Sequence, residues 1–538
     1  MPTKIDVSSP RTPAAIGKGR SWREIALLAA TALVVIFTLI PITYLAIRAF
    51  EKPLPEIFQL LFRDKTLEVV GRTTFLVLIV VAFNTIVGTI LATGIFFVKL
   101  PFARYLIIPA ILPLAIPSYV FTYTWLAIVP SLSGFFAASF ILILTTMPYA
   151  VLATLIGLRR VDTGLIEVAQ TLGLGRVQIF FRVIFPQIRL NISAGALLIG
   201  LYVMSDFGAV SLLNTETLTV SIQNMYKASY DRSAAAVIAM ILILASAIFI
   251  LLEERFKGSS KSSAIAKSYS VKTLLIEKIS YRTTILALLT IYVALAVFAP
   301  FYVLISRFLG NPEPIEFSNL FSAALSTITV SGLGALIALL LSIPISIMNS
   351  KSEGAVARGA ERIILISHAL PGVVIGLALV SLGSKISALY QTTLLLAFAY
   401  SLLFLAKSVA STTASLKQVP TVLKDVAASL GKSSFKVATQ VTLPLALPGI
   451  GLGALLVFLT AMKELPATLM LRPTGMETLA TQIWSFASIN RFNEAAPYAL
   501  LLVLIAAVPT FLLSLPERLE SQDRDTDQNR IRDLGESR

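Results

Sequence analysis

Four carboxylates, arranged as two pairs, are the side chains of this sequence most able to take part in chemistry. Asp206 pairs with Glu464, and Glu167 pairs with Asp425, each at a spacing of 258 residues. Carboxylate oxygens suit hard cations such as Fe³⁺, or form ion pairs with basic groups of a partner protein. A spacing that recurs in this way indicates two fused copies of one unit.

The first pair, Asp206 and Glu464, lies near the ends of long apolar segments. Carboxylates inside a membrane are costly and usually face a cavity. We therefore consider both as candidate residues of a translocation pathway, where they could attract a cation. The alternative is that they cap or orient the loops that follow, with Lys463 neutralising Glu464. No metal site is assigned, because the chain has one histidine and no cysteine.

The second pair, Glu167 and Asp425, begins a short segment that occurs twice. Residues 167–173 recur in altered form at 425–431, and a proline follows each copy at the same distance. Each copy is polar, lies between long apolar runs and ends in glycine, which accepts the left-handed conformation that terminates helices. A short helix along the membrane surface is predicted in each unit. A generic amphipathic interfacial helix is the alternative, and two copies at one spacing argue against it.

Nucleotide chemistry is not expected in this chain. The tripeptide Gly431-Lys432-Ser433 resembles part of a phosphate-binding loop, but Val426 stands where the full pattern needs glycine. The tripeptide also follows a predicted helix, where that motif requires a strand. No clustered set of His, Asp and Ser at one membrane depth indicates an enzyme active site.

The composition predicts an all-α polytopic membrane protein. Apolar residues make up 56% of the 538 residues, charged residues 14%, and mean hydropathy is +0.84. Long apolar runs without strand-like alternation favour helices over a barrel. About twelve transmembrane helices are expected, at residues 25–47, 73–98, 105–129, 134–158, 190–213, 234–252, 283–306, 325–348, 363–383, 389–413, 446–469 and 496–515.

Charge sets the expected orientation. With the N-terminus in the cytoplasm, most of the 44 Lys and Arg residues fall on the cytoplasmic side of the predicted helices, as the positive-inside rule requires. The C-terminus then lies on that side as well. We interpret the net charge of +15 as a consequence of this topology and of contact with anionic lipid. Nucleic-acid binding is not expected, because no basic stripe or aromatic platform accompanies the charge.

Five parts are expected along the chain. They are a cytoplasmic N-terminal segment (1–24), a first unit (25–256), a cytoplasmic linker (257–279), a second unit (280–516) and a charged cytoplasmic tail (517–538). The repeated polar loops are 159–189 and 414–445. Six predicted helices separate these loops, and an even number returns the chain to the same side. The two six-helix units are therefore parallel repeats, unlike the inverted repeats of many secondary transporters.

The repeated loops resemble the cytoplasmic coupling loop of ABC importer permeases. In that family a short helix docks in a cleft of an ATPase subunit and transmits its closure to the membrane helices. The resemblance is carried by Glu167, Ala169 and Gly173, and by Asp425, Ala427 and Gly431. It implies that the alanines allow close approach to the ATPase. Val168 and Val426 depart from a family alanine, and Asp425 is a shorter carboxylate than its counterpart.

This resemblance also implies a fold and a set of partners. The expected fold is the MetI-like fold of binding-protein-dependent ABC permeases, in the inner (cell) membrane of a bacterium or archaeon. Two copies of an ATP-binding subunit would hold ATP and Mg²⁺, and an external binding protein would deliver the substrate. The chain itself would be a non-catalytic permease without a cofactor.

Residues 205–212 and 463–468 resemble segments of fused, two-unit ferric-iron permeases. Ferric iron is therefore the expected substrate. Fused thiamine permeases share the architecture, and polyamine and anion permeases use related units, so these substrates stay open. An ion-coupled secondary transporter with parallel repeats is the alternative of another class, and it leaves the repeated loops unexplained.

Overall fold

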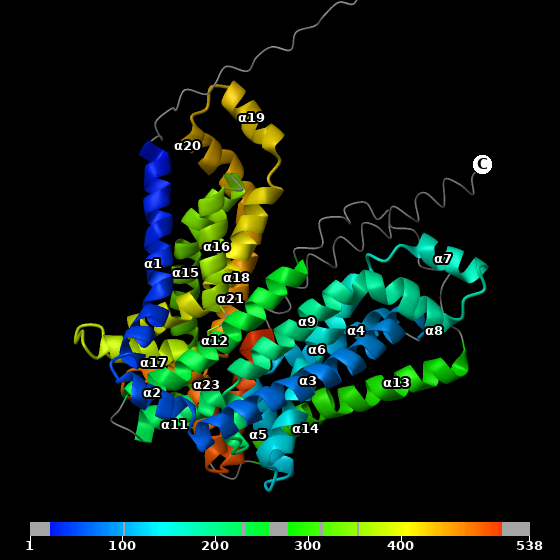
Figure 1. Ribbon diagram of the computed structural model, residues 1–538, viewed down its shortest axis with the longest axis horizontal. Coiled ribbons are helices and arrows are strands. Elements are labelled where there is room, and N and C mark those ends of the chain that lie inside the picture. Colours follow the sequence, from blue (N-terminus) through cyan, green and yellow to red (C-terminus); the bar gives the residue numbers. More distant parts are fainter. Residues whose placement is uncertain are drawn as a thin grey trace, which may run out of the picture.

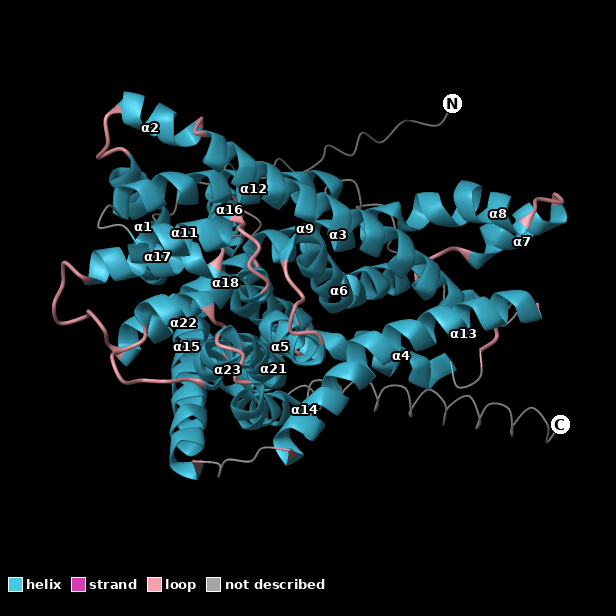
Figure 2. Ribbon diagram, turned by 90° about the horizontal axis from the view of Figure 1, so that it is seen from below, coloured by secondary structure: helices cyan, strands magenta, loops and turns pink. Residues whose placement is uncertain are grey.

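The computed structural model describes residues 22–100, 103–228, 232–257, 278–310, 316–351, 354–368 and 370–507. The regular elements within these ranges are helices (Figure 1 and Figure 2). Most of the N-terminal segment 1–24, nearly all of the linker 257–279 and the whole tail 517–538 lie outside the described residues. The expectation of an all-α protein is confirmed for the part of the chain that is described.

Nine helices in the described ranges are long and apolar enough to cross a membrane. Between 22% and 72% of the most apolar stretch of each helix is buried in the bundle. The helices that form them are α1 (Trp22–Ala49), α3 (Asp64–Phe97), α6 (Gly134–Leu158), α9 (Phe185–Ser205), α12 (Arg232–Lys257), α13 and α14 (Ile279–Val293 and Ala299–Leu309, joined by a π-helical turn), α15 (Phe317–Lys351), α18 (Thr393–Gln418) and α21 (Leu443–Ala461).

The predicted span 105–129 is a broken helix, as its prolines indicate. Residues Leu106–Ala115 and Ser118–Ile128 are bent by 97°. Proline explains the break, because Pro113 and Pro117 cannot donate the backbone hydrogen bonds that would continue the helix. Helix α5 (Ser118–Ile128) starts directly after Pro117. If this pair counts as one span, the described residues contain ten.

Two further predicted spans are shorter in the structure. The segment 363–383 is divided between α16 (Ala355–His368) and α17 (Gly372–Gly383), and Pro371 stands at the start of α17. The predicted span 496–515 corresponds to the apolar helix Phe492–Ala507, and the residues beyond it are not described. The expected twelve segments thus comprise ten candidate spans and two shorter apolar helices.

Each unit is built around three helices in equivalent positions. In the first unit α3, α6 and α9 pack together, and in the second α15, α18 and α21 do so. Glycine permits close contact: a Cβ at Gly195 of α9 would lie 2.6 Å from the Cβ of Ala153 in α6. Small residues at such contacts are typical of helix packing in membranes.

The first helix of each unit packs against the other unit, which the sequence did not predict. Helix α1 contacts α15, α16 and α17 of the second unit as well as α12, and α13 contacts α3 and α4 (Ala103–Ile111) of the first unit. The hydroxyl of Tyr292 in α13 lies 3.4 Å from the Leu144 carbonyl oxygen of α6. This exchange ties the two repeats together along their length.

The units also meet through short helices at the end away from the repeated polar loops. Trp484 of α23 (Leu479–Ser488) donates to the Ser211 hydroxyl of α10 (Gly208–Leu212) at 3.1 Å, and the Tyr123 hydroxyl of α5 donates to the Phe492 carbonyl at 2.8 Å. Figure 1 shows α7 and α19, which form the polar loops, at the tips of two separate helical arms. The polar loops therefore do not hold the units together.

Introduced cysteines should report the sidedness that charge predicts. The chain has no native cysteine, so a single cysteine at an exposed position such as Ser131 or Ser434 gives an unambiguous signal. We expect a membrane-impermeant maleimide to label Ser131→Cys in intact cells and to label Ser434→Cys only after permeabilisation. Labelling of Ser434→Cys in intact cells would reverse the orientation.

Candidate functional site

The first polar loop contains helix α7 (Thr163–Thr171), and short-range signals fix both of its ends. Asp162 caps the N-terminus by accepting a hydrogen bond from the Gly164 amide at 2.9 Å. At the C-terminus Gly173 has a φ of +78°. The Gly173 amide donates to the Gln170 carbonyl at 2.9 Å, and the Leu174 amide donates to the Ala169 carbonyl at 3.1 Å. These two bonds form a Schellman motif, which stops the helix sharply.

The second polar loop repeats this geometry in α19 (Thr421–Ser429). Gly431 also has a φ of +78°, and its amide donates to the Ala428 carbonyl at 2.9 Å. The Lys432 amide donates to the Ala427 carbonyl at 3.2 Å. The N-terminus differs, because Pro420 stands at the cap position and provides no side-chain hydrogen bond. The predicted short helices and glycine stops are present in both units.

Each polar loop is joined to a long helix without an unstructured link. In the first unit α8 (Arg176–Ile179) continues through a π-helical turn, Phe180–Ile184, into α9. In the second unit α20 (Ser434–Val437) continues through the equivalent turn, Ala438–Thr442, into α21. Single π-helical turns inside helices are frequent at functional sites. Each polar loop is therefore continuous with a membrane helix.

Ala169 and Ala427 face inward in the structure. Their side chains are only 4% and 5% exposed, and Ala169 belongs to a core with Ile166, Ile179 and Ile184 of the same loop. The close approach that a small residue allows at these positions is therefore within the loop itself. The expectation that these alanines allow close approach to an ATPase subunit stays a prediction.

Glu167 and Asp425 are exposed, as a residue that meets a partner must be. Around each of them lie exposed apolar side chains at equivalent positions of the two loops. We call these six side chains the apolar docking face: Leu165, Val168 and Leu172 in the first loop, and Leu423, Val426 and Leu430 in the second. Exposed apolar groups that gather on a polar loop typically mark an interaction site.

The sequence reasoning identified the acidic residues and missed the apolar docking face. The sequence does carry a signal for this face. Valine stands at positions 168 and 426, where the family has alanine. Leucine also recurs at the equivalent positions 165 and 423, and at 172 and 430.

The structure uses Asp206 as a helix cap. Its carboxylate is 8% exposed and accepts hydrogen bonds from the amides of Ala209 at 3.0 Å and Val210 at 3.4 Å, at the start of α10. The Ser118 hydroxyl of α5 also donates to it. Asp206 therefore holds α10 against the start of α5, the second half of the broken helix.

Glu464 has the same role in the second unit. It is 8% exposed and accepts from the amides of Ala467 at 2.9 Å and Thr468 at 3.0 Å, at the start of α22 (Pro466–Leu471). A side chain at Gly372, the first residue of α17, would collide with this carboxylate. The geometry thus favours the capping alternative for both carboxylates over the pathway interpretation. No ion pair links Lys463 to Glu464 among the described residues.

Loss of the Glu464 cap should destabilise the protein measurably. In Glu464→Ala the buried amides of Ala467 and Thr468 lose their acceptor, which costs about 1–3 kcal/mol. The exposed pair of Glu68 and Arg72 provides a control, because Glu68→Ala should cost less than about 1 kcal/mol. Thermal unfolding in detergent compares the two variants, and equal stability losses would contradict a structural role for Glu464.

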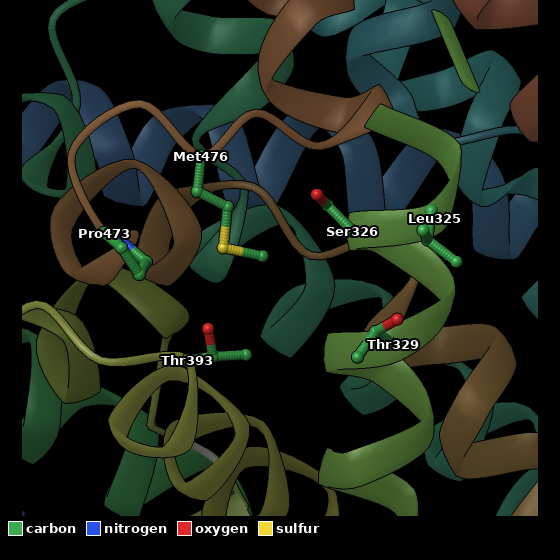
Figure 3. A pocket seen from close by; sticks show the side chains of 6 residues that line it. All are labelled: Leu325, Ser326, Thr329, Thr393, Pro473 and Met476. Carbon is green, nitrogen blue, oxygen red and sulfur yellow. The ribbon is translucent and has the colours of Figure 1, made fainter. Parts of the chain in front are cut away.

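One hollow on the surface lies apart from all of these residues. It has a volume of about 340 Å³ and is lined by Leu325, Ser326, Thr329, Thr393, Pro473 and Met476 (Figure 3). The lining has no ionisable side chain and includes no predicted site residue. We assign no function to it. Among the described residues no group of three or more His, Asp or Glu could hold a metal ion.

Two parallel units with paired polar loops that continue into membrane helices define the class of a two-unit membrane permease. The chain belongs to the family described as binding-protein-dependent transport system inner membrane component, whose sequence model matches it twice, at residues 84–257 and 338–518. The family fold is confirmed, and the protein is a multi-pass membrane protein. Members of this family work with ATPase and substrate-binding partners.

Three curated relatives show how far the similarity extends. The Fe(3+)-transport system permease protein FbpB 2 of Haemophilus influenzae is 32% identical over 486 residues, which cover 88% of this chain and 95% of the relative. The chloroplastic sulfate permease 2 of Chlamydomonas reinhardtii is 27% identical over 40% of this chain and 63% of its own length. The molybdenum transport system permease protein ModB of Mycobacterium tuberculosis is 28% identical over 35% of this chain and 76% of its own length.

Proposed function

We propose that this chain is the permease subunit of an ATP-driven ABC importer for ferric iron delivered by an external binding protein. The paired polar loops support the energy source, because each carries an exposed acidic residue within an apolar docking face and leads directly into a membrane helix. The similarity to the Fe(3+) permease, which extends over 88% of this chain, supports the substrate.

Two copies of an ATP-binding subunit fit this geometry, one on each loop. ATP and Mg²⁺ would be bound by those subunits, and the permease would be neither an enzyme nor a holder of a cofactor. Closure of the ATP-binding subunits would draw α7 and α19 together. Because α9 and α21 continue from the loops, the same movement would close the helices on the ATPase side and open them on the other side.

The proposed location is the inner (cell) membrane of a bacterium or archaeon, with both termini in the cytoplasm. The polar loops then face the cytoplasm. Helices α2 (Leu54–Leu61), α11 (Leu218–Ala228) and α23 lie at the end of the molecule remote from α19 (Figure 1). That end is the docking surface proposed for the binding protein.

Thiamine and polyamines are the alternative substrates, and an ion-coupled secondary transporter is the alternative class. A secondary transporter would move its substrate without a partner ATPase, and the apolar docking face would have no occupant. Co-purification of the chain with an ATP-binding subunit separates the two classes. Transport by the purified chain alone would favour the secondary transporter.

Uptake measurements in a deletion strain test the substrate. We expect cells that express the permease with its ATPase and binding protein to take up labelled ferric iron, and not labelled thiamine or spermidine. Vesicles without ATP should take up none. Restored thiamine uptake without iron uptake would contradict the ferric-iron proposal and leave the importer class intact.

A further inference from the structure

The two units carry different charges at equivalent positions of α9 and α21. Tyr202 and Ser205 on α9 correspond to Thr460 and Lys463 on and just after α21, at the spacing of 258 residues. Each of these four side chains is partly exposed. The first unit thus offers neutral hydroxyls where the second unit offers a cation.

The adjacent helices show the same difference. Tyr149 on α6 lies with its ring 5.9 Å from the ring of Tyr202. The equivalent of Tyr149 is Lys407 on α18, whose ammonium lies 3.3 Å from the Thr460 hydroxyl. The pair of tyrosines in one unit is therefore replaced by a lysine and a threonine in the other, in the same geometry.

Lys407 lies near the middle of a 26-residue candidate span and is partly exposed. An ionisable side chain at this depth does not face lipid; it faces the interior of the bundle or a water-filled space. The ammonium group of Lys463 donates to the Leu114 carbonyl oxygen of the first unit at 3.4 Å. That contact places Lys463 where the two units meet. The Lys407 ammonium contacts the Thr460 hydroxyl, and the Lys463 amide donates to the Thr460 carbonyl at 3.2 Å. The two lysines are therefore neighbours.

No carboxylate among the described residues forms an ion pair with either ammonium group. The nearest acidic residue in sequence, Glu464, has its oxygens engaged by the start of α22. Asp206 is engaged in the same way by α10. Two lysines without a carboxylate partner among the described residues thus lie on α18 and just after α21, and tyrosine and serine hydroxyls stand at the equivalent positions of the first unit.

We propose that a positively charged patch, formed by the neighbouring Lys407 and Lys463 where the second unit meets the first, binds an oxyanion during transport. A bare Fe³⁺ ion would be repelled by two ammonium groups at a site of low dielectric. Ferric iron enclosed by oxyanion ligands, with a net negative charge, would be attracted, and the hydroxyl groups would donate hydrogen bonds to its outer oxygens. The part of this proposal in which the oxyanion carries ferric iron rests on the proposed function. No bond is broken or formed in this step.

Reconstituted complexes test the patch directly. Proteoliposomes hold the permease with its ATPase, and the binding protein is loaded with labelled iron in the presence of labelled phosphate, citrate or bicarbonate. We expect iron to enter together with one of the labelled anions, which identifies the ligand. In Lys407→Gln/Lys463→Gln, iron entry should fall at least about tenfold, because a charge interaction at a partly buried site is worth that much or more.

Further variants separate charge from structure. Lys407→Glu should transport more slowly than Lys407→Gln, and Lys407→Arg should restore much of the wild-type rate. Stimulation of ATP hydrolysis by the loaded binding protein should persist in the Gln double variant, since the polar loops are unchanged. Lys278→Gln, at an exposed position before α13, should behave as wild type. Faster iron entry in Lys407→Glu would indicate a path for the bare cation and overturn the inference.

The outcomes also separate this inference from the proposed substrate. Wild-type complexes that move iron without any anion, with no loss in the Gln double variant, would overturn the patch and leave ferric iron in place. Complexes that move free phosphate or sulfate but no iron, and lose this activity in the Gln double variant, would support the patch and overturn ferric iron. Movement of neither iron nor an oxyanion would overturn both.

Discussion

Valine at both Gly173 and Gly431 is expected to abolish transport while leaving the permease in the membrane. Each glycine has a φ of +78°, where a β-branched residue is strained by about 1–2 kcal/mol. A Cβ at either position would meet nothing within 4 Å, so the effect acts through the backbone and not through a collision. Relief of the strain breaks the hydrogen bonds that end α7 and α19. Both short helices then lose the orientation that docking requires.

The matched control is asparagine at the same two positions. Asparagine tolerates the left-handed conformation, so Gly173→Asn/Gly431→Asn should keep most of the transport activity although it adds a side chain of similar size. Uptake and binding-protein-stimulated ATP hydrolysis are measured at equal membrane abundance. Wild-type transport by the valine double variant would mean that these loops do not couple ATP hydrolysis to transport.

Local signals explain why the polar loops could be predicted from sequence. The glycine stops at Gly173 and Gly431 depend on residues within one helical turn, and the backbone angles of both match the expectation. The spacing of 258 residues predicted a second loop of the same form, and α19 has it. The cap at Asp162 is equally local, since its partner is two residues away.

Features that depend on distant partners could not be predicted. The cap of Asp206 on α10 is local, but the hydrogen bond that joins this carboxylate to α5 comes from Ser118, which lies 88 residues earlier in the chain. The exchange of α1 and α13 between units leaves no trace in the hydrophobicity of either helix. The 97° bend between Leu106–Ala115 and α5 has, in contrast, a local cause that the sequence shows, because Pro113 lies in the predicted span.

The inward orientation of Ala169 could not be predicted from the sequence either. Periodicity places Ala169 and Glu167 on different faces of α7, but it does not say which face meets the partner. Only the packing of Ile166 and Ile184 around Ala169 settles that the outer face carries Leu165, Val168 and Leu172. For this reason the docking of each loop is expected to depend on apolar contact at least as much as on the acidic residue.

Aspartate at both Leu172 and Leu430 should therefore prevent assembly with the ATP-binding subunits. These leucines are 74% and 75% exposed, so a polar replacement does not disturb the permease itself. In the complex each leucine would be buried, and loss of a buried leucine costs roughly 1.5–3 kcal/mol. Burial of an unpaired carboxylate adds several kcal/mol. Together the two sites should weaken binding by more than about a hundredfold, since each 1.4 kcal/mol is a factor of ten.

Comparison with Glu167→Ala shows how much of the free energy of docking comes from the acidic residue and how much from the apolar docking face. An ion pair that stays exposed contributes only about 0–1 kcal/mol, and a desolvated one at an interface contributes roughly 2–5 kcal/mol when broken. Because the second loop remains, Glu167→Ala should weaken assembly without abolishing it. Co-purification and titration with the ATP-binding subunit rank the variants. If Glu167→Ala abolished binding and the leucine double variant bound normally, docking would depend on charge, and the apolar docking face would be assigned to contact with lipid headgroups instead.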